Sequence, residues 1–270
     1  MFSMDIRERY SIMDWGKAKT YLIIAFTITN IILMFSIFSD RTDENSYFTK
    51  ESYESLEQFL LQKNLNLHTE LPKETPKMGT LKVEYQSFDL GDLESRFLEY
   101  KSNIEILGDK TLTLKAKRKL ALFDTDHAKS DTKLFVDTYD LGRDFDLKYA
   151  SFEGENIVVV YNSVYKNRFL EDSYMKFTYF PDESFEFEML KMNPVEESKN
   201  KKIVMTSIEA VMRASNMMEE NETITEVVLG YNYAQYESLS IAKTKTATAF
   251  PCWRIKTKEN QYYYIEALEF

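Results

Sequence analysis

Few residues in this sequence have the types and spacing that enzyme chemistry requires. Cys252 is the only cysteine, and His68 and His127 are the only histidines. A cysteine nucleophile needs a base beside it, but Cys252 lies between Pro251 and Trp253 in a predicted strand. We therefore interpret Cys252 as a small buried apolar side chain.

The segment Asp124–His127, with the sequence DTDH, contains the carboxylate and imidazole ligands that many metal sites use. Its four residues are adjacent and lack the regular spacing that brings ligands together on one ion. We interpret this segment as an exposed polar loop. A single cysteine also excludes an intramolecular disulfide and a thiolate metal cluster.

Other catalytic patterns are equally weak. Hydrolysis of cell-wall sugars would need two carboxyl groups at a set separation, and among 44 acidic residues the sequence singles out no pair. The seven glycines form neither a G-x-x-x-x-G-K-[ST] nor a G-x-G-x-x-G loop. We predict no catalytic residue, no metal site and no cofactor.

The charge is distributed unevenly along the chain. The net charge is -10 over 270 residues, and the first 38 residues carry four basic and three acidic side chains, which gives +1. The remaining 232 residues therefore carry -11. Such an acidic body argues against nucleic acid as a partner and against adhesion to anionic lipid.

Residues 21–38 form an apolar segment of 18 residues without a charge. This length approaches the roughly 20 residues that a helix needs to cross the hydrocarbon core of a bilayer. The segment is too long for a typical signal-peptide core, and no A-x-A-like cleavage site follows it. We predict an uncleaved transmembrane helix, with a buried core helix as the alternative.

The orientation of this helix follows from the basic residues near its ends. Its N-terminal side carries Arg7, Arg9, Lys17 and Lys19. Cationic flanks are retained in the cytoplasm, so residues 1–20 are predicted to be a short cytoplasmic segment of a single-pass cell-membrane protein. Residues 39–50 are a predicted spacer, and residues 51–270 a predicted extracytoplasmic domain.

Side chains that suit the membrane interface precede the span. Aromatic rings prefer the headgroup region, and lysines can extend their charged ends toward water. The predicted interfacial anchors are Trp15, Lys17, Lys19 and Tyr21.

Asn30 lies at the middle of the predicted span, where no water can bind its carboxamide. A helix places it on one face with four other residues, at spacings of three and four: Phe26, Thr27, Met34 and Ile37. This face suits packing against another transmembrane helix, where a carboxamide hydrogen bond contributes about 1 kcal/mol. The alternative is that Asn30 bonds only to its own helix backbone.

The predicted extracytoplasmic domain has an α+β pattern. Helical periodicity occurs at 51–65, 89–102 and 207–221. Alternating apolar and polar residues predict strands at 80–88, 110–123, 156–167, 173–181, 184–192, 226–236, 250–258 and 260–270. Helix followed by strands occurs twice, so we predict two similar halves, 51–165 and 166–270, each a helix with an antiparallel sheet.

The last predicted strand is rich in tyrosine. Tyr262 and Tyr264 share one face, and Tyr263 and Ile265 share the other. One face must belong to the core. The other is either a contact surface or a second packed face.

Several segments together resemble the YycI (WalI) family of low-GC Gram-positive bacteria. The N-terminal match is MDWGKAKTYLIIAFTITNIILMFSIF, with its Asp-Trp-x-Lys-x-Lys start and central asparagine. Further matches are LPKETPKMGTLKV, VVLGYNYAQY and TATAFPCWRIKTKENQYYYIEAL. The twelve residues before Met13 depart from the family pattern, and Met1, Met4 and Met13 are alternative starts.

This resemblance implies a single-pass protein with an extracytoplasmic α+β body of the YycH/YycI type. It implies a regulator that acts without catalysis and works with a YycH-like partner on the sensor histidine kinase WalK (YycG), which controls cell-wall metabolism. It also implies contacts through transmembrane helices, for which Asn30 and its helical face are candidates. The alternative function is an anchored extracytoplasmic enzyme, or a ligand-binding protein, that acts on cell-wall polymers.

Overall fold

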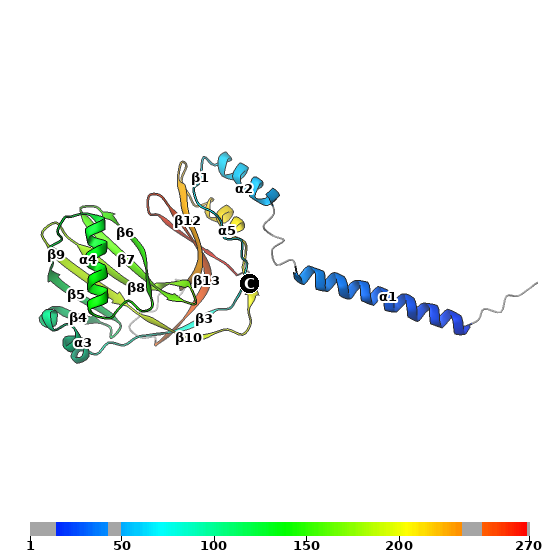
Figure 1. The fold of residues 1–270 in the computed structure, drawn as a ribbon, viewed down its shortest axis with the longest axis horizontal. Helices are drawn as coiled ribbons and strands as arrows, with labels where there is room; N and C mark the ends of the chain where they lie inside the picture. Colours follow the sequence, from blue (N-terminus) through cyan, green and yellow to red (C-terminus); the bar gives the residue numbers. More distant parts are fainter. Residues whose placement is uncertain (1–14, 43–49, 234–244, 269–270) are drawn as a thin grey trace, which may run out of the picture. The chain divides into compact units, whose positions relative to one another are not determined.

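A computed structural model of the chain describes residues 15–42, 50–233 and 245–268. It divides the chain into two compact units, residues 1–47 and residues 48–270. The described part of the first unit is one long helix. The second unit, which we call the body, contains the other described helices and all described strands (Figure 1).

The helices confirm most of the predicted positions. They are α1 (Trp15–Thr42), α2 (Lys50–Gln62), α3 (Leu90–Arg96), the short 3-10 helix η1 (Leu98–Asn103), α4 (Thr125–Thr138) and α5 (Ser207–Ala214). α1 contains the whole predicted span 21–38. Only α4 has no counterpart among the predicted helices.

The strands are β1 (Asn66–Leu67), β2 (Lys77–Met78), β3 (Leu81–Tyr85), β4 (Ile104–Leu107), β5 (Thr111–Lys117), β6 (Phe145–Glu153), β7 (Asn156–Tyr165), β8 (Arg168–Tyr179), β9 (Ser184–Leu190), β10 (Met192–Glu197), β11 (Lys202–Ile203), β12 (Thr223–Tyr233), β13 (Thr246–Thr257) and β14 (Tyr262–Glu266). β3 alternates between buried and exposed positions along its whole length, as the period-two pattern predicts, whereas β7 and β13 contain runs of buried residues.

Twelve of these strands form one large sheet, and β2 pairs with β11 in a small second one. The main path of the large sheet runs β10-β3-β13-β12-β8-β9-β5-β4. Three branches leave it: β14 pairs with β13, β1 pairs with β12, and β7 and β6 continue from β8. Most pairs are antiparallel, and the short β12–β8 and β1–β12 contacts are parallel. The mixed α+β class that the sequence predicts is therefore confirmed.

α4 corrects our interpretation of Asp124–His127. Asp124 is not part of an exposed loop but caps this helix, because its Oδ1 accepts hydrogen bonds from the N–H groups of Asp126 and His127 at 3.0 and 2.8 Å. Both carboxylate oxygens also lie 2.9 Å from Nδ1 of His127. Among the described residues, no three metal-type ligands come together.

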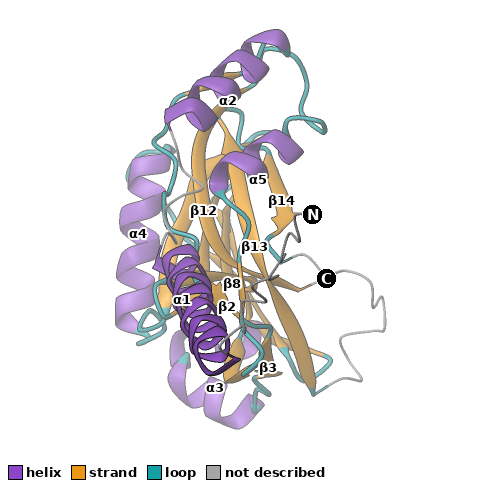
Figure 2. Cartoon of the chain, turned by 90° about the vertical axis from the view of Figure 1, so that its right-hand side faces the viewer, coloured by secondary structure: helices purple, strands orange, loops and turns teal. Residues whose placement is uncertain are grey.

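Two hydrophobic clusters stabilise the body on different parts of the large sheet. The first packs α2 and α5 against β3, β12, β13 and β14 around Trp253, which is fully buried. Figure 2 shows α2 and α5 together above these strands, whereas α4 lies along another part of the sheet. Nε1 of Trp253 donates to the Met205 carbonyl at 3.0 Å, so its only polar atom is satisfied.

The second cluster packs α3 and α4 against β5 and β7–β9, and aromatic rings dominate it. It takes its residues from positions 93–189, whereas the first cluster joins residues 56–85 to residues 170–268. The clusters thus do not follow the predicted halves 51–165 and 166–270, because β3 pairs with β10 and β13 from late in the chain. That two halves are similar stays a prediction.

Candidate functional sites

The structure describes part of the predicted face of α1. Phe26 is 70% exposed, and Thr27 and Asn30 are exposed on the same helix. The side chains of Met34 and Ile37 lie outside the described residues. Among the predicted interfacial anchors, Lys19 and Tyr21 are exposed, and the side chains of Trp15 and Lys17 lie outside the described residues.

Within the described residues, no helix combines the length and the apolar character needed to cross a membrane. The transmembrane span therefore stays a prediction.

The carboxamide of Asn30 bonds to its own helix. Its Nδ2 donates to the carbonyl oxygen of Phe26 at 3.0 Å, one turn earlier. Thr27 and Thr29 make the same kind of bond, to the carbonyls of Ile23 and Ala25. The bond of Asn30 uses one amide N–H, while a carboxamide also has a second N–H and a carbonyl oxygen for a partner.

A second candidate site lies inside the body, where β8 bulges. Asn162 of β7 pairs with Tyr174 of β8, but the next residue, Ser163, pairs with Leu170, so residues 171–173 have no partner in β7. Each residue of the bulge has its own hydrogen-bond partner outside β8. Asn162 Nδ2 donates to the Glu171 carbonyl at 2.8 Å, the Met192 N–H donates to Ser173 Oγ at 3.0 Å, and the Tyr233 N–H donates to Asp172 Oδ2 at 2.7 Å.

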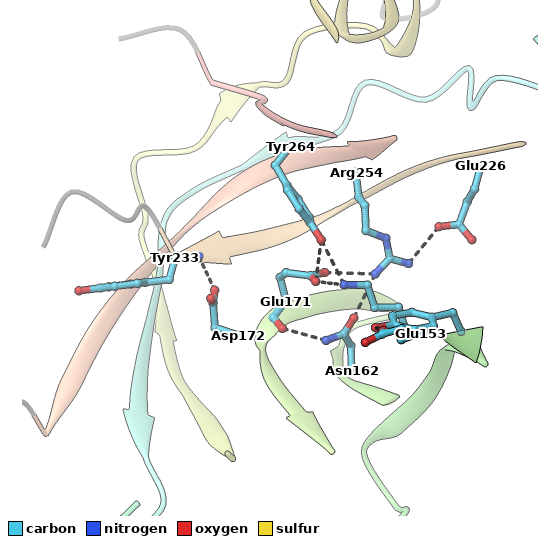
Figure 3. A network of polar contacts seen from close by, with 10 residues as sticks. Glu153, Asn162, Glu171, Asp172, Glu226, Tyr233, Arg254 and Tyr264 are labelled. Atoms are coloured by element: carbon cyan, nitrogen blue, oxygen red, sulfur yellow. Dashed lines mark hydrogen bonds and ion pairs between the residues drawn. The ribbon is translucent and has the colours of Figure 1, made fainter. Parts of the chain in front are cut away.

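The bulge directs the Glu171 carboxylate into a buried charged network (Figure 3). Oε1 of Glu171 accepts from Lys148 Nζ and, at 2.7 Å, from the hydroxyl of Tyr264. Oε2 accepts from Nη1 of Arg254 at 3.2 Å. The side chains of Glu171, Lys148 and Arg254 are only 12%, 9% and 8% exposed. Both carboxylate oxygens therefore have donors from other strands.

The network joins strands that do not pair with each other. Lys148 comes from β6, and Tyr264 from β14, yet Lys148 Nζ lies 3.1 Å from the Tyr264 hydroxyl. The rings of Tyr149 and Tyr262, on the same two strands, are 5.9 Å apart. Figure 3 shows Arg254 and Tyr264 on one layer of strands, facing Glu171 and Asn162 on the other. Side chains thus connect two branches of the sheet that backbone hydrogen bonds leave separate.

Arg254 is held from several sides. Nη1 also donates to Asn162 at 3.1 Å, and Nη2 donates to Glu226 at 3.1 Å. Its guanidinium stacks on the ring of Phe169 at 4.3 Å. That ring lies over Gly230, where an added Cβ would come within 2.5 Å of it. Glycine at this position of β12 is what allows Phe169 to approach the strand.

Burial and charge shift the pKa values of the network. Burial lowers the pKa of Lys148, although Glu171 acts in the opposite direction. For Arg254, burial is outweighed by Glu171 and Glu226, which raise its pKa. Burial and the nearby Glu171 raise the pKa of the Tyr264 hydroxyl, which stays protonated and donates to Glu171. These contacts suit a role in holding strands together.

Asp172 gives a prediction about pH. Burial raises its pKa to about 6, although the Tyr233 N–H donates to it. An unfolded aspartate has a pKa near 4, so the native state binds more protons between about pH 4 and 6 and loses stability as the pH rises through this window. We expect Asp172→Asn, which keeps the acceptor oxygen, to gain about 1–3 kcal/mol of stability relative to the original chain between pH 4 and pH 7.

The measurement is urea unfolding of both proteins at four pH values, followed by the fluorescence of buried Trp253. The other titrating groups are the same in both proteins, so their effects cancel when the two free energies of unfolding are subtracted. A difference that stays constant with pH would contradict the assignment.

Other predicted features are confirmed. Cys252 is 4% exposed in β13, and burial raises the pKa of its thiol. Tyr263 and Ile265 face the first hydrophobic cluster. Tyr262 and Tyr264 point to the opposite face and pack against the charged network, so the strand is packed on both faces.

No local pattern in the sequence predicts the charged network. Arg254 lies in the predicted strand 250–258, where a charged side chain is normally exposed, and Lys148 lies in no predicted strand. The bulge that turns Glu171 inward has no sequence signature of its own. One signal in the sequence is the position of Arg254 between the large apolar residues Trp253 and Ile255.

Comparisons with known proteins place the chain in a family. A model of the YycI protein family matches residues 43–268. Two solved structures are similar at 8% sequence identity. An uncharacterized protein from Eubacterium rectale has a TM-score of 0.47 over 81% of this chain and 99% of its own, and YycH from Bacillus subtilis has a TM-score of 0.46 over 73% of this chain and 55% of its own.

A search of the curated proteins finds no match. The family model, in contrast, covers nearly the whole body, including the bulge, the charged network and both hydrophobic clusters. The chain therefore belongs to the YycI family.

Proposed function

We propose that this chain is a membrane-anchored regulator that acts without catalysis. With a YycH-like partner it modulates the sensor histidine kinase WalK (YycG), which controls cell-wall metabolism, through transmembrane and extracytoplasmic contacts. The match to the YycI family over residues 43–268 carries this proposal, because it supports a regulatory role in the WalK system.

In this proposal residues 21–38 cross the cell membrane, residues 1–20 are cytoplasmic, and the body is extracytoplasmic. The exposure of large apolar side chains along α1 supports it, since such side chains require lipid or protein around them. Those described are Tyr21, Leu22, Ile23, Ile24, Phe26, Ile28, Ile31 and Leu33.

A regulator of this kind needs a difference in affinity and no chemical step. It must bind one signalling state of the kinase more tightly than another, and the shift in kinase output cannot exceed that difference. A tenfold preference corresponds to about 1.4 kcal/mol. A few helix contacts, one of them a hydrogen bond from Asn30, are enough to supply such a difference.

The contribution of Asn30 can be measured directly. We expect Asn30→Leu to insert normally but to weaken co-purification with the kinase and the YycH-like protein about fivefold, since about 1 kcal/mol of hydrogen bonding is lost. The measurement is quantitative pull-down from detergent-solubilised membranes.

The matched control is Thr29→Leu. Thr29 is also an exposed polar residue of α1 whose side chain donates to a carbonyl one turn earlier. Its side chain is about 100° around the helix from that of Asn30. Unchanged co-purification of Asn30→Leu, or equal loss in both variants, would contradict a specific role for Asn30.

Kinase activity tests the proposal as a whole. The full chain, the YycH-like protein and the kinase are reconstituted in lipid vesicles, and phosphate incorporation from ATP is followed with and without the chain. We expect the chain to change the phosphorylated fraction of the kinase. The same phosphorylated fraction in both samples would overturn the proposal.

A further inference from the structure

We propose that a surface of the body next to the N-terminus of α4 docks a partner protein that presents an apolar side chain flanked by lysine or arginine. This inference rests on the proposed function, because it assigns to the body a surface for the extracytoplasmic contact. We call the surface the aromatic patch and define it by Leu120, Phe123, Phe152, Phe180 and Pro181.

The patch exposes two aromatic rings that touch each other. The rings of Phe123 and Phe152 are 6.2 Å apart and meet edge to face. Phe152 is 53% exposed and Phe123 is 40% exposed, and the adjacent Leu122 is 61% exposed. Phe152 lies near the end of β6, whereas Phe123 precedes α4, so two separate parts of the sequence build this apolar surface. Single exposed apolar residues are ordinary, but contacting aromatic rings are typical of interfaces.

A small cavity of about 170 Å³ adjoins these rings, lined by Leu120, Phe123, Tyr179, Phe180 and Pro181 among others. It is smaller than the 300–1,000 Å³ that is usual for small-molecule sites. It suits one anchoring side chain of a protein instead. Such apolar pockets at the centre of a contact account for much of the affinity of protein complexes.

Hydrogen bonds to α4 hold the floor of the cavity in place. The hydroxyl of Tyr179 donates to Asp131 at 2.9 Å and lies 2.9 Å from Oγ1 of Thr132, both on α4. Arg118 also binds Asp131, with Nε–Oδ2 and Nη2–Oδ1 distances of 2.5 and 3.0 Å. A surface already held in place loses little conformational entropy on binding.

The charges around the patch favour a cationic partner. Phe123 and Pro181 are each followed by a carboxylate, Asp124 and Asp182. Glu155 and Glu183 add two more, and the two nearby lysines, Lys117 and Lys119, are paired with Asp182 and Glu183. Carboxylates therefore exceed lysines here. A second copy would bring the same excess of negative charge, so self-association through this patch is disfavoured.

The patch also lies at a free edge of the sheet. In the described part of the chain, β6 forms backbone pairs with β7 alone. The outer side of residues 150–153 can therefore donate and accept backbone hydrogen bonds from an extended segment of a partner. This edge, the rings and the charges together point to a protein as occupant.

The test uses the full chain in its membrane, with the YycH-like protein of the same bacterium as the probe. A photo-crosslinking residue replaces Phe152 in one variant and Leu134 in a control. Leu134 lies on α4, is 61% exposed and is not part of the patch. We expect crosslinks to the YycH-like protein from position 152 and few or none from position 134.

Two substitutions test the chemistry of the contact. Phe152→Lys and Glu155→Lys should each reduce co-purification of the YycH-like protein at least fivefold, whereas Leu134→Lys should leave it unchanged. Both positions are exposed, and an unchanged unfolding midpoint verifies that each variant is folded.

The outcomes separate this inference from the proposed function. If the unmodified chain does not associate with the YycH-like protein, the docking surface and the proposed function are both contradicted. If association is normal but position 152 gives no crosslink, or if the lysine variants bind as well as the control, only the docking surface is overturned.

Discussion

Replacing Glu171 by alanine is expected to lower the free energy of unfolding of the body by about 3–5 kcal/mol. The substitution leaves Lys148 and Arg254 as buried cations without the carboxylate that both contact. Removing one member of a buried ion network lowers the free energy of unfolding by more than the intact network adds to it, because the remaining charges stay buried without a partner. The measurement is urea unfolding of the full chain in detergent, followed by the fluorescence of Trp253.

A surface pair provides the control. Lys115 and Glu186 lie 3.6 Å apart, and their side chains are 65% and 34% exposed. Because water screens this pair, Glu186→Ala should change stability by less than about 1 kcal/mol. Equal effects of the two substitutions would show that the network at Glu171 does not hold the branches of the sheet together.

Phe135→Ala is expected to destabilise the body by a similar amount, about 3–5 kcal/mol. Phe135 is 1% exposed on the inner face of α4. Its ring lies within 6.3 Å of six other aromatic rings, centre to centre: Phe97, Tyr100, Tyr139, Phe177, Phe185 and Phe187. Truncation would leave a cavity that these rings, fixed by strands and helices, cannot fill.

The neighbouring residue serves as the matched control for Phe135. Leu134 belongs to the same helix but is 61% exposed, so Leu134→Ala should change stability by less than about 0.5 kcal/mol. Thermal or urea unfolding of the two variants decides the point. A small effect at Phe135 would mean that α4 does not pack on the sheet as described.

The two predictions concern different parts of one regulatory body. Phe135 stabilises the second hydrophobic cluster, and Trp253 lies at the centre of the first. Glu171 lies in the bulge of β8 and binds Arg254 of β13.

Much of the fold could be predicted because local patterns agree with it. β3, with Leu81, Val83 and Tyr85 buried, shows the alternation expected for a strand with one buried face. α5 has a helical apolar face and a threonine cap at Thr206, whose Oγ1 accepts from the Glu209 N–H. In these segments local preference and tertiary packing favour the same structure.

α4 shows where this reasoning failed. The predicted strand 110–123 runs past the end of β5 at Lys117, and the polar residues after it have the composition of a loop. The helical signal was present: Asp124 is a good cap, and the buried residues Ala128, Thr132, Phe135 and Val136 follow at helical spacing. Threonine and charged residues dilute this periodicity, so only packing against the sheet makes it evident.

The charged network could not be predicted for a different reason. Lys148, Asn162 and Glu171 come from the consecutive strands β6, β7 and β8, whereas Arg254 comes from β13, 83 residues after Glu171. Only the bulge in β8 and the branching of the sheet bring them together. Asn30, in contrast, was identified from sequence because a carboxamide in an apolar segment is unusual wherever that segment lies.

Crosslinking from position 30 in living cells tests the central claim most directly. A photoreactive residue replaces Asn30 in the full chain, and adducts are identified after irradiation of intact membranes. The proposed regulator predicts adducts with a transmembrane helix of the WalK kinase or of its YycH-like partner. Adducts with lipid alone, or no adducts, would contradict the claim that this helix acts through contact with the kinase system.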